Sequence, residues 1–162
     1  MPPVEIDPKS CGICALNARI RAGQFRDFIA ELPKSYVILG DAQLYRGYCI
    51  LFARYHATEL FLMPPDEARA LFDEMRSVAE AIATVVRPLK MNYDCLGNVE
   101  PHVHWHLFPR HESDDLRRGP VWMRPERERK VELPADDHRN LIASLRSEIV
   151  RLIPSARVRP TP

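Results

Sequence analysis

The sequence predicts a single domain of the α+β class, in which antiparallel strand pairs are combined with two long amphipathic helices. Two pairs of short β-rich segments are each joined by fewer residues than a parallel crossover needs. Two further segments carry apolar residues at helical spacing. A chain of 162 residues is the size of one ordinary domain. We assign residues 1–154 to this domain.

The composition is that of a soluble globular protein, with 46% hydrophobic and 28% charged residues. Lys and Arg total 23 against 22 for Asp and Glu, without the basic excess of most duplex-binding proteins. Residues 1–12 lack a positively charged stretch followed by an apolar run, and the apolar stretches are too short for a membrane span. We therefore expect a cytoplasmic protein with neither nucleic acid nor membrane as a partner.

The first strand pair consists of residues 35–39 and 48–53, both rich in β-forming residues. Gly40-Asp41 ends the first strand and Gly47 precedes the second. About eight residues separate the strands, which favours an antiparallel hairpin with a longer loop.

The clearest helix begins at Pro64-Pro65-Asp66-Glu67, which combines an early proline with acidic residues in the first turn. Pro88 ends it. Its apolar stripe recurs at steps of three and four residues. The stripe comprises Leu71, Met75, Val78, Ile82 and Val85, widened by Phe72, Ala79 and Val86.

A second antiparallel pair is predicted from Lys90 to Cys95 and from His102 to Phe108, with a turn at Gly97-Asn98 and an end at Pro109.

The C-terminal part combines a polar segment, a helix and a tail. Residues 111–134 are polar and interrupted by prolines, and the mixed-charge run 124–130 is interpreted as a solvated loop. A second helix is predicted over residues 136–152, with Leu141, Leu145, Ile149 and Leu152 on one side. Residues 155–162 are expected to form a disordered tail.

Residues 102–107 have the sequence His-Val-His-Trp-His-Leu, in which histidines alternate with apolar residues. On a strand, side chains two apart share a face about 7 Å apart, so three imidazoles line one side. Four of the six histidines of the chain lie within ten positions. A lone histidine would be interpreted as a packed structural residue, but this cluster predicts a functional site.

Two chemistries fit three histidines on one face. They can hold zinc and activate water. Alternatively, one neutral imidazole attacks phosphorus while the next donates a proton to the leaving oxygen. Glu100 is the only acidic residue close by, which slightly weakens the metal hypothesis. The chain has no Walker-type glycine loop, so any phosphate must be held by side chains and the strand.

Two of the four cysteines, Cys11 and Cys14, form a C-x-x-C pair. In a reducing compartment this pair is interpreted as a metal or redox site, and the isolated Cys49 and Cys95 as core residues. A thioredoxin-like motif would need a strand before the pair, and residues 1–10 are a poor strand.

The motif HVHWHLF resembles the signature of the histidine triad (HIT) superfamily of nucleotide hydrolases and transferases. Residues 92–101 and Pro109-Arg110 are similar to its bacterial diadenosine-tetraphosphate-hydrolase-like branch. The resemblance extends from about Cys11 to Trp122. It implies an HIT-like α+β fold, with an antiparallel meander sheet of about five strands and two main helices, assembled as a homodimer.

The resemblance also implies roles for individual residues. His104 would attack an α-phosphate to form a nucleotidyl-histidine intermediate, and His106 would contact the phosphate and the leaving group. Asn92 and Asn98 match polar positions that line the phosphate, and Asp41 falls near the position that holds the ribose. The implied substrate contains adenine and is either a dinucleoside polyphosphate or another AMP conjugate.

Some relatives bind a structural zinc through two N-terminal cysteines, a histidine after the second strand and the first triad histidine. The matching residues are Cys11, Cys14, His56 and His102. The chain departs from the family at Tyr48, where many members carry a histidine that supports the site. Two alternatives remain, a nucleotide-binding module without turnover and a zinc-dependent hydrolase that uses the three clustered histidines.

Overall fold

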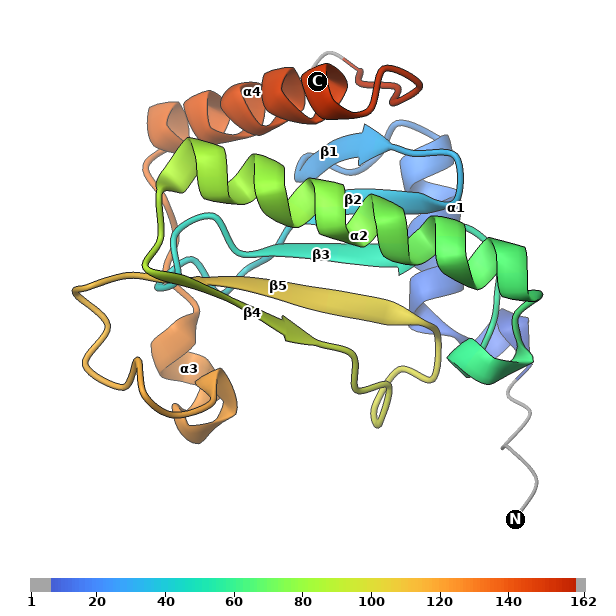
Figure 1. The fold of residues 1–162 in the computed structure, drawn as a ribbon, viewed down its shortest axis with the longest axis horizontal. Helices are drawn as coiled ribbons and strands as arrows, with labels where there is room; N and C mark the ends of the chain where they lie inside the picture. Colours follow the sequence, from blue (N-terminus) through green and yellow to red (C-terminus); the bar gives the residue numbers. More distant parts are fainter. Residues whose placement is uncertain (1–6, 160–162) are drawn as a thin grey trace.

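A computed structural model describes residues 7–159, which form a five-stranded antiparallel sheet with helices on both faces (Figure 1). The α+β fold class predicted from the sequence is confirmed. The strands are β1 (Phe28–Glu31), β2 (Ser35–Leu39), β3 (Cys49–Ala53), β4 (Lys90–Asp94) and β5 (His104–Arg110). The α-helices are α1 (Gly12–Arg21), α2 (Pro65–Val86), α3 (Glu126–Arg129) and α4 (Ala135–Leu152), with 3₁₀ turns η1 (Pro8–Ser10), η2 (Leu60–Leu62) and η3 (Val121–Met123).

The strand order is β1-β2-β3-β5-β4. The expected meander holds for β1 to β3, and the hairpin of β4 and β5 is added in reverse order. As a result β5 lies between β3 and β4, with Phe52 opposite His104 and Ile50 opposite His106. The histidine-bearing strand therefore occupies an interior position of the sheet.

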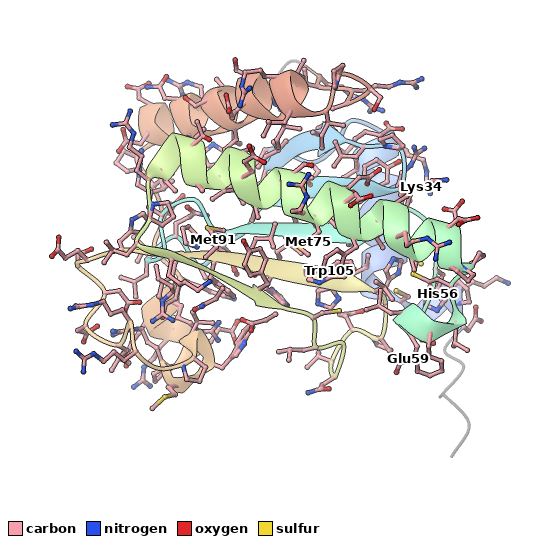
Figure 2. The ribbon with its side chains drawn as sticks, viewed as in Figure 1. Lys34, His56, Glu59, Met75, Met91 and Trp105 are labelled. Carbon is pink, nitrogen blue, oxygen red and sulfur yellow. The ribbon has the colours of Figure 1, made fainter. Side chains whose placement is uncertain are left out.

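The two faces of the sheet are covered differently. Helices α2 and α4 cover one face, and α1 lies on the other (Figure 1). In Figure 2, Trp105 and Met75 lie between β5 and α2. The alternation of β5 places its apolar residues in this core and its histidines on the opposite face, as predicted. Trp105 and Leu107 of β5 lie in this core, together with Val103 just before the strand.

Helix α2 begins at Pro65, as its proline and early acids predict, and ends where Arg87 adopts φ 48° before Pro88. Leu71, Met75, Val78 and Ile82 are buried as expected. Phe72 is 55% exposed, which corrects its place in the apolar stripe. The position that turns inward is Glu74, whose carboxylate accepts hydrogen bonds from Ser35 Oγ at 2.6 Å and Lys34 N at 2.9 Å.

Strand β5 differs from the predicted 102–108 at both ends. His102 lies before the strand, where its side chain turns toward the N-terminal segment. Pro109 lies within the strand, opposite Met91 of β4. The β3 ladder ends at Leu107, so a residue without an N–H is tolerated beyond that point.

The helix α1 and the strand β1 had no counterpart in the sequence prediction. Strand β1 has only four residues, and Glu31 at its end exchanges backbone hydrogen bonds of 2.8 Å with Arg157. The expected disordered tail is thereby corrected for residues 155–159, because an edge strand offers unpaired backbone groups to the chain that returns beside it. Residues 160–162 of that prediction, like residues 1–6, lie outside the described residues.

The charged segment 121–130 also departs from the prediction of a solvated loop. It forms η3 and α3, and the backbone N–H of Leu44 donates to the Arg129 carbonyl at 3.1 Å. Ala42 and Val131 form a parallel bridge just beyond it. These contacts hold the segment against the loop between β2 and β3. Within residues 7–159, every helix is too short or too polar to cross a membrane.

Candidate functional site

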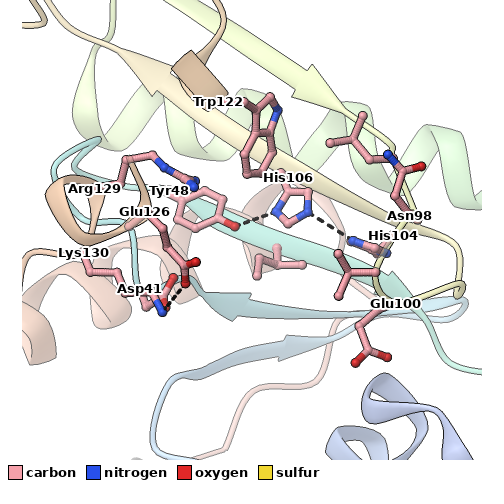
Figure 3. A pocket seen from close by; sticks show the side chains of 15 residues that line it. Asp41, Tyr48, Asn98, Glu100, His104, His106, Trp122, Glu126, Arg129 and Lys130 are labelled. Carbon is pink, nitrogen blue, oxygen red and sulfur yellow. Dashed lines mark hydrogen bonds and ion pairs between the residues drawn. The ribbon is translucent and has the colours of Figure 1, made fainter. Parts of the chain in front are cut away.

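His104 and His106 form a hydrogen-bonded pair on the face of β5 away from α2. Their Nε2 atoms are 3.1 Å apart, and the rings meet edge to face with centroids 4.9 Å apart. His104 Nδ1 lies 2.6 Å from the carbonyl oxygen of His102, and His106 Nδ1 lies 2.6 Å from the hydroxyl of Tyr48. The chain of contacts from Tyr48 to His102 is drawn in part in Figure 3.

These contacts determine which nitrogens carry protons when both rings are neutral. A carbonyl oxygen only accepts, so Nδ1 of His104 carries the proton and its Nε2 is unprotonated. The short Nε2–Nε2 contact then requires the hydrogen on His106. Nδ1 of His106 is left as an acceptor, and the Tyr48 hydroxyl donates to it. His104 is thereby arranged as a nucleophile and His106 as a hydrogen-bond donor.

Tyr48 is held in place by its surroundings. Its ring stacks on Phe108 at a centroid distance of 4.0 Å and an interplanar angle of 2°. Gly40 passes on another side of the ring, where a Cβ would lie 2.1 Å from a ring carbon. Burial raises the pKa of the Tyr48 phenol far above its ordinary value, so the hydroxyl keeps its proton.

Burial also lowers the pKa of His106 to about 4, assisted by the neighbouring His104 and Arg129. His106 is therefore neutral near pH 7, in agreement with the proton arrangement above.

The pair opens into a pocket of about 420 Å³. Figure 3 shows Tyr48, Arg129 and Lys130 toward one end of it and Asn98 and Glu100 toward the other, with the histidines between. The pocket is lined by Asp41, Ala42, Tyr48, Ile50, Leu96–Glu100, His104, His106, Trp122, Glu126, Arg129 and Lys130.

The predicted substrate-binding residues divide into two groups. Asp41 and Asn98 line the pocket, and Asp41 forms a 3.0 Å ion pair with Lys130. Asn92 does not line it. Its Oδ1 accepts a 2.7 Å hydrogen bond from the buried Arg110, which also pairs with Asp114. Asn92 thus helps to hold Arg110, which in turn holds the loop that follows β5.

Trp122 and Arg129 are pocket residues that the sequence prediction missed. The Trp122 ring meets His106 edge to face at 5.1 Å, and the Arg129 guanidinium lies 4.8 Å from the centre of the same ring. The only signal in the sequence was an aromatic residue, Trp122, next to the charged run 124–130. Contact with β5 depends on how the chain folds back after residue 110, which no local pattern reveals.

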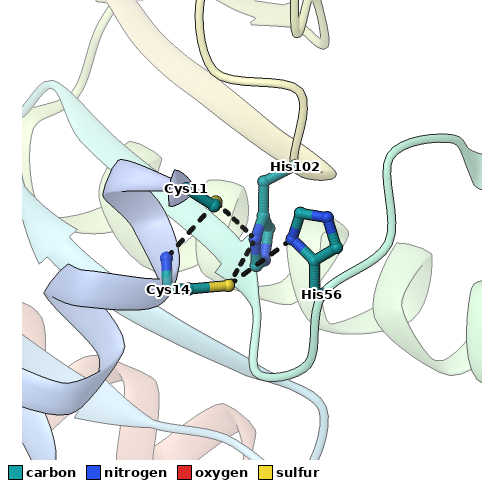
Figure 4. Close-up of side chains that lie close together, drawn as sticks. All are labelled: Cys11, Cys14, His56 and His102. Atoms are coloured by element: carbon teal, nitrogen blue, oxygen red, sulfur yellow. Dashed lines mark hydrogen bonds between the residues drawn. The ribbon is translucent and has the colours of Figure 1, made fainter. Parts of the chain in front are cut away.

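The four residues predicted to bind metal converge at the other end of β5 (Figure 4). Their ligand atoms all lie within 4.8 Å of one another. Cys11 Sγ is 3.5 Å from His102 Nδ1, and Cys14 Sγ is 3.4 Å from His56 Nδ1 and 3.6 Å from His102 Nδ1. Cys11 is the N-cap of α1, which carries Cys14 in its first turn.

This donor set fits zinc. With Zn–S about 2.3 Å and Zn–N about 2.0 Å, a tetrahedral site has S–N edges of about 3.6 Å, close to the three observed distances. His102 Nε2 lies 2.9 Å from the Ala53 carbonyl and donates to it, so its Nδ1 presents a lone pair toward the cysteines. The residues are arranged as zinc ligands are.

The same geometry separates His102 from the other two histidines. Its imidazole faces the cysteines, and Nδ1 of His104 is engaged by a backbone carbonyl. Among residues 7–159, the two-cysteine, two-histidine cluster is the one group of three or more such side chains placed to hold a metal. The described residues therefore favour zinc at the two-cysteine, two-histidine cluster over a site built from the three clustered histidines. Cys95, expected in the core, is exposed, whereas Cys49 is buried as predicted.

Comparison with known proteins identifies the family. The HIT domain profile matches residues 23–113, more than half of the chain. The chain belongs to the HIT domain family, whose members are generally nucleotide hydrolases or transferases. No curated protein gives a significant match.

Solved structures of the family have the same fold. A histidine triad protein from Bradyrhizobium japonicum is 25% identical, with a TM-score of 0.67 over 82% of this chain and 95% of that one. One from Marinobacter aquaeolei VT8 is 24% identical, with a TM-score of 0.67 over 83% and 95%. A zinc-bound family member from Mycobacterium smegmatis is 22% identical, with a TM-score of 0.61 over 87% and 96%.

Proposed function

We propose that this protein is a nucleotide hydrolase or nucleotidyl transferase that cleaves an AMP-linked substrate at its α-phosphate. The reaction proceeds through a covalent nucleotidyl-His104 intermediate. The substrate is adenine-containing, as in the diadenosine-tetraphosphate-hydrolase-like branch, and Asp41 and Asn98 contact its nucleotide part. The observation that carries this proposal is the proton arrangement of the pair, which leaves Nε2 of His104 unprotonated in a pocket that both rings line.

In the first step, Nε2 of His104 bonds to the α-phosphorus and the bond from phosphorus to the leaving group breaks. The electron pair moves to the leaving atom, and the N–H of His106, which donates to Nε2 of His104 before the substrate binds, donates a hydrogen bond to that atom instead. The carbonyl of His102 accepts from Nδ1–H throughout and stabilises the positive charge that the His104 ring acquires.

In the second step, the oxygen of water bonds to phosphorus and the P–N bond breaks. Its electron pair returns to Nε2 of His104, and the proton of the water is released to solvent. The products are AMP and the neutral imidazole, ready for another cycle. A competing alcohol or amine in place of water would make the same chemistry a nucleotidyl transfer.

Cys11, Cys14, His56 and His102 would hold one Zn²⁺ in a closed tetrahedral site, as their spacing supports. The ion, when bound, supplies a structural cross-link between α1 and the residues that precede β5. The zinc-bound relative from Mycobacterium smegmatis is consistent with this role. His102 also contributes the carbonyl that orients His104, so the metal cluster and the reactive pair share one residue.

We also propose a cytoplasmic homodimer that joins sheets along β4. Strand β4 lies at the end of the sheet, where its Tyr93 is 48% exposed and the preceding Leu89 is 64% exposed. At the opposite edge, β1 is bridged by Arg157. An open edge with exposed apolar side chains is suited to pairing with a second copy.

The test is intact-mass measurement after brief mixing with a panel of AMP conjugates. We expect a mass gain of one adenylyl group in the wild type and none in His104→Asn. That variant should still bind nucleotide and melt near the wild-type temperature, because its key bond forms only in the reaction. Nucleotide binding without an adenylyl adduct or turnover would instead favour the alternative, a binding module.

A further inference from the structure

Asp94 lies directly opposite His106 in the ladder between β4 and β5. Side chains of directly paired residues stand on the same side of a sheet, so the Asp94 carboxylate is on the histidine face. It is half-buried and is not among the side chains that line the pocket. Burial raises the pKa of Asp94, and a hydrogen bond from the Trp122 side chain opposes this rise. Because an indole N–H only donates, the carboxylate is its acceptor.

The Trp122 ring connects Asp94 to the reactive pair. It meets the His106 ring edge to face at a centroid distance of 5.1 Å and the Phe108 ring at 5.5 Å, and the Arg129 guanidinium lies 4.8 Å from its centre. Figure 3 shows the indole beside His106. Ring contacts alone leave an indole free to slide, whereas a hydrogen bond to a carboxylate fixes the position of its N–H edge.

His106 depends on this ring most when a substrate is bound. In the free protein its two nitrogens are held by the Tyr48 hydroxyl at 2.6 Å and by Nε2 of His104 at 3.1 Å. In the proposed reaction its N–H turns from His104 to the leaving atom. The contacts that then remain on the protein side are the Tyr48 hydroxyl and the neighbouring aromatic rings, of which Trp122 is one.

We propose that Asp94 is a positioning residue for the reaction, which holds the Trp122 ring against His106 through the indole N–H. The ring keeps water from His106 and fixes the direction in which its N–H points. The effect on turnover rests on the proposed function, but the contact itself requires no substrate. Asp94 acts only through Trp122, since it lies outside the pocket lining.

The direction of one pKa shift separates this role from a direct effect of charge. A carboxylate favours the charged form of a nearby imidazole, so the loss of the Asp94 charge alone would lower the pKa of His106 further. Release of the Trp122 ring would instead admit water and raise the pKa of His106 from about 4 toward its ordinary value of about 6.5. The other titratable or charged groups that face His106 are the same in every variant below: Asp41, Tyr48, His104 and Arg129.

The experiment titrates the His106 ring by ¹⁵N NMR without any substrate. We expect the pKa of His106 to rise by about one pH unit in Asp94→Ala. Asp94→Asn keeps an oxygen that accepts the indole N–H, so its rise should be smaller. Trp122→Phe keeps a ring without the N–H, so its combination with Asp94→Ala should add little to the larger single shift. The matched control is Asp73→Ala, which removes an exposed carboxylate from α2 and should titrate like the wild type.

An unchanged or lower pKa of His106 in Asp94→Ala would overturn the proposal, and so would fully additive shifts in the double variant. If Asp94→Ala does not fold, Trp122→Phe tests the same contact, and a wild-type titration of His106 in that variant would overturn the proposal.

Turnover separates this inference from the proposed reaction. In a protein that forms the adenylyl adduct, Asp94→Ala should lower kcat about tenfold with KM little changed, and Asp94→Asn should recover most of the loss. The expected titration shifts in a protein that never forms an adduct would support the positioning contact and reject the proposed reaction. A normal adduct together with wild-type kcat and wild-type titration in Asp94→Ala would reject the positioning contact alone.

Discussion

The hydroxyl oxygen of Tyr48 lies 2.6 Å from Nδ1 of His106, on a ring that stacks against Phe108. At this position the chain departs from the histidine that its resemblance to the family implies. The phenol provides a donor that burial keeps protonated, so it directs the single proton of His106 to Nε2. Tyr48 in place of the family histidine is thus compatible with an ordered pair of His104 and His106.

Tyr48→Phe tests this role because it removes one oxygen and retains the stacked ring. We expect kcat to fall about tenfold, the worth of one buried hydrogen bond, with KM little changed. The ¹⁵N chemical shifts of His106 should change from a dominant Nε2–H form to a mixture of both tautomers. Unchanged shifts together with unchanged kcat would contradict the assignment.

Gly40→Ala should disturb the same contact by displacing the Tyr48 ring. The added Cβ would lie 2.1 Å from a carbon of Tyr48, so the phenol must move away from His106. We expect activity to fall at least as far as in Tyr48→Phe, and the double variant to lose little more than the larger single loss. Gly23→Ala is the control for a general loss of stability, since its positive φ strains the backbone while nothing lies within 4 Å of its Cβ position. If the activity losses of Gly40→Ala and Tyr48→Phe were fully additive, the two substitutions would not act through the same contact between Tyr48 and His106.

Stability should fall with acidification over the window set by His106. Its pKa is about 4 in the folded chain and about 6.5 when unfolded, so between these values the unfolded chain binds more protons. The free energy of unfolding should therefore decrease as the pH falls from about 6.5 to 4. Urea titrations of wild type and His106→Asn at several pH values measure this, and the variant should show a shallower decrease. Parallel curves would exclude His106 as the source.

Cys11→Ser tests the metal cluster while retaining a residue that can cap α1. We expect the wild type, purified without chelator or metal-affinity resin, to carry about one zinc per chain. The variant should carry less than a tenth of an equivalent and melt several degrees lower. Cys95→Ser is the control, because that thiol is exposed and outside the cluster. A metal-free wild type as stable as Cys11→Ser would leave the cysteines as ordinary thiols.

Tyr93→Lys on the exposed face of β4 should weaken the proposed dimer. A charge at an apolar edge opposes association with an identical edge. Sedimentation should show a dimer for the wild type at micromolar concentration and a shift toward monomer for the variant. Phe72→Lys, at an exposed position on α2 away from β4, is the control and should leave the dimer unchanged. A monomeric wild type would refute the dimer.

Local patterns were sufficient for most of the secondary structure and for the reactive strand. The period-two alternation of residues 102–107 separates histidines from apolar residues on any strand, and the core needs the apolar side buried. The proline, acids and stripe of residues 64–88 similarly predict α2 from interactions within a few turns. Short β1 and the amphipathic α1 lack such strong local signals, and only packing against the sheet stabilises them.

Other features depend on contacts between distant parts of the chain, and only the tertiary structure decided them. The sequence suggested Cys11, Cys14, His56 and His102 as ligands through resemblance, but their convergence requires α1 to lie beside the start of β5. Asn92 matched a phosphate-lining position, but its side-chain oxygen accepts a hydrogen bond from the buried Arg110 guanidinium. Arg129 belonged to a run of mixed charge that, on its own, would remain in water. Folding of segment 121–130 against β5 places the Arg129 guanidinium over the Trp122 ring, which in turn meets His106 edge to face.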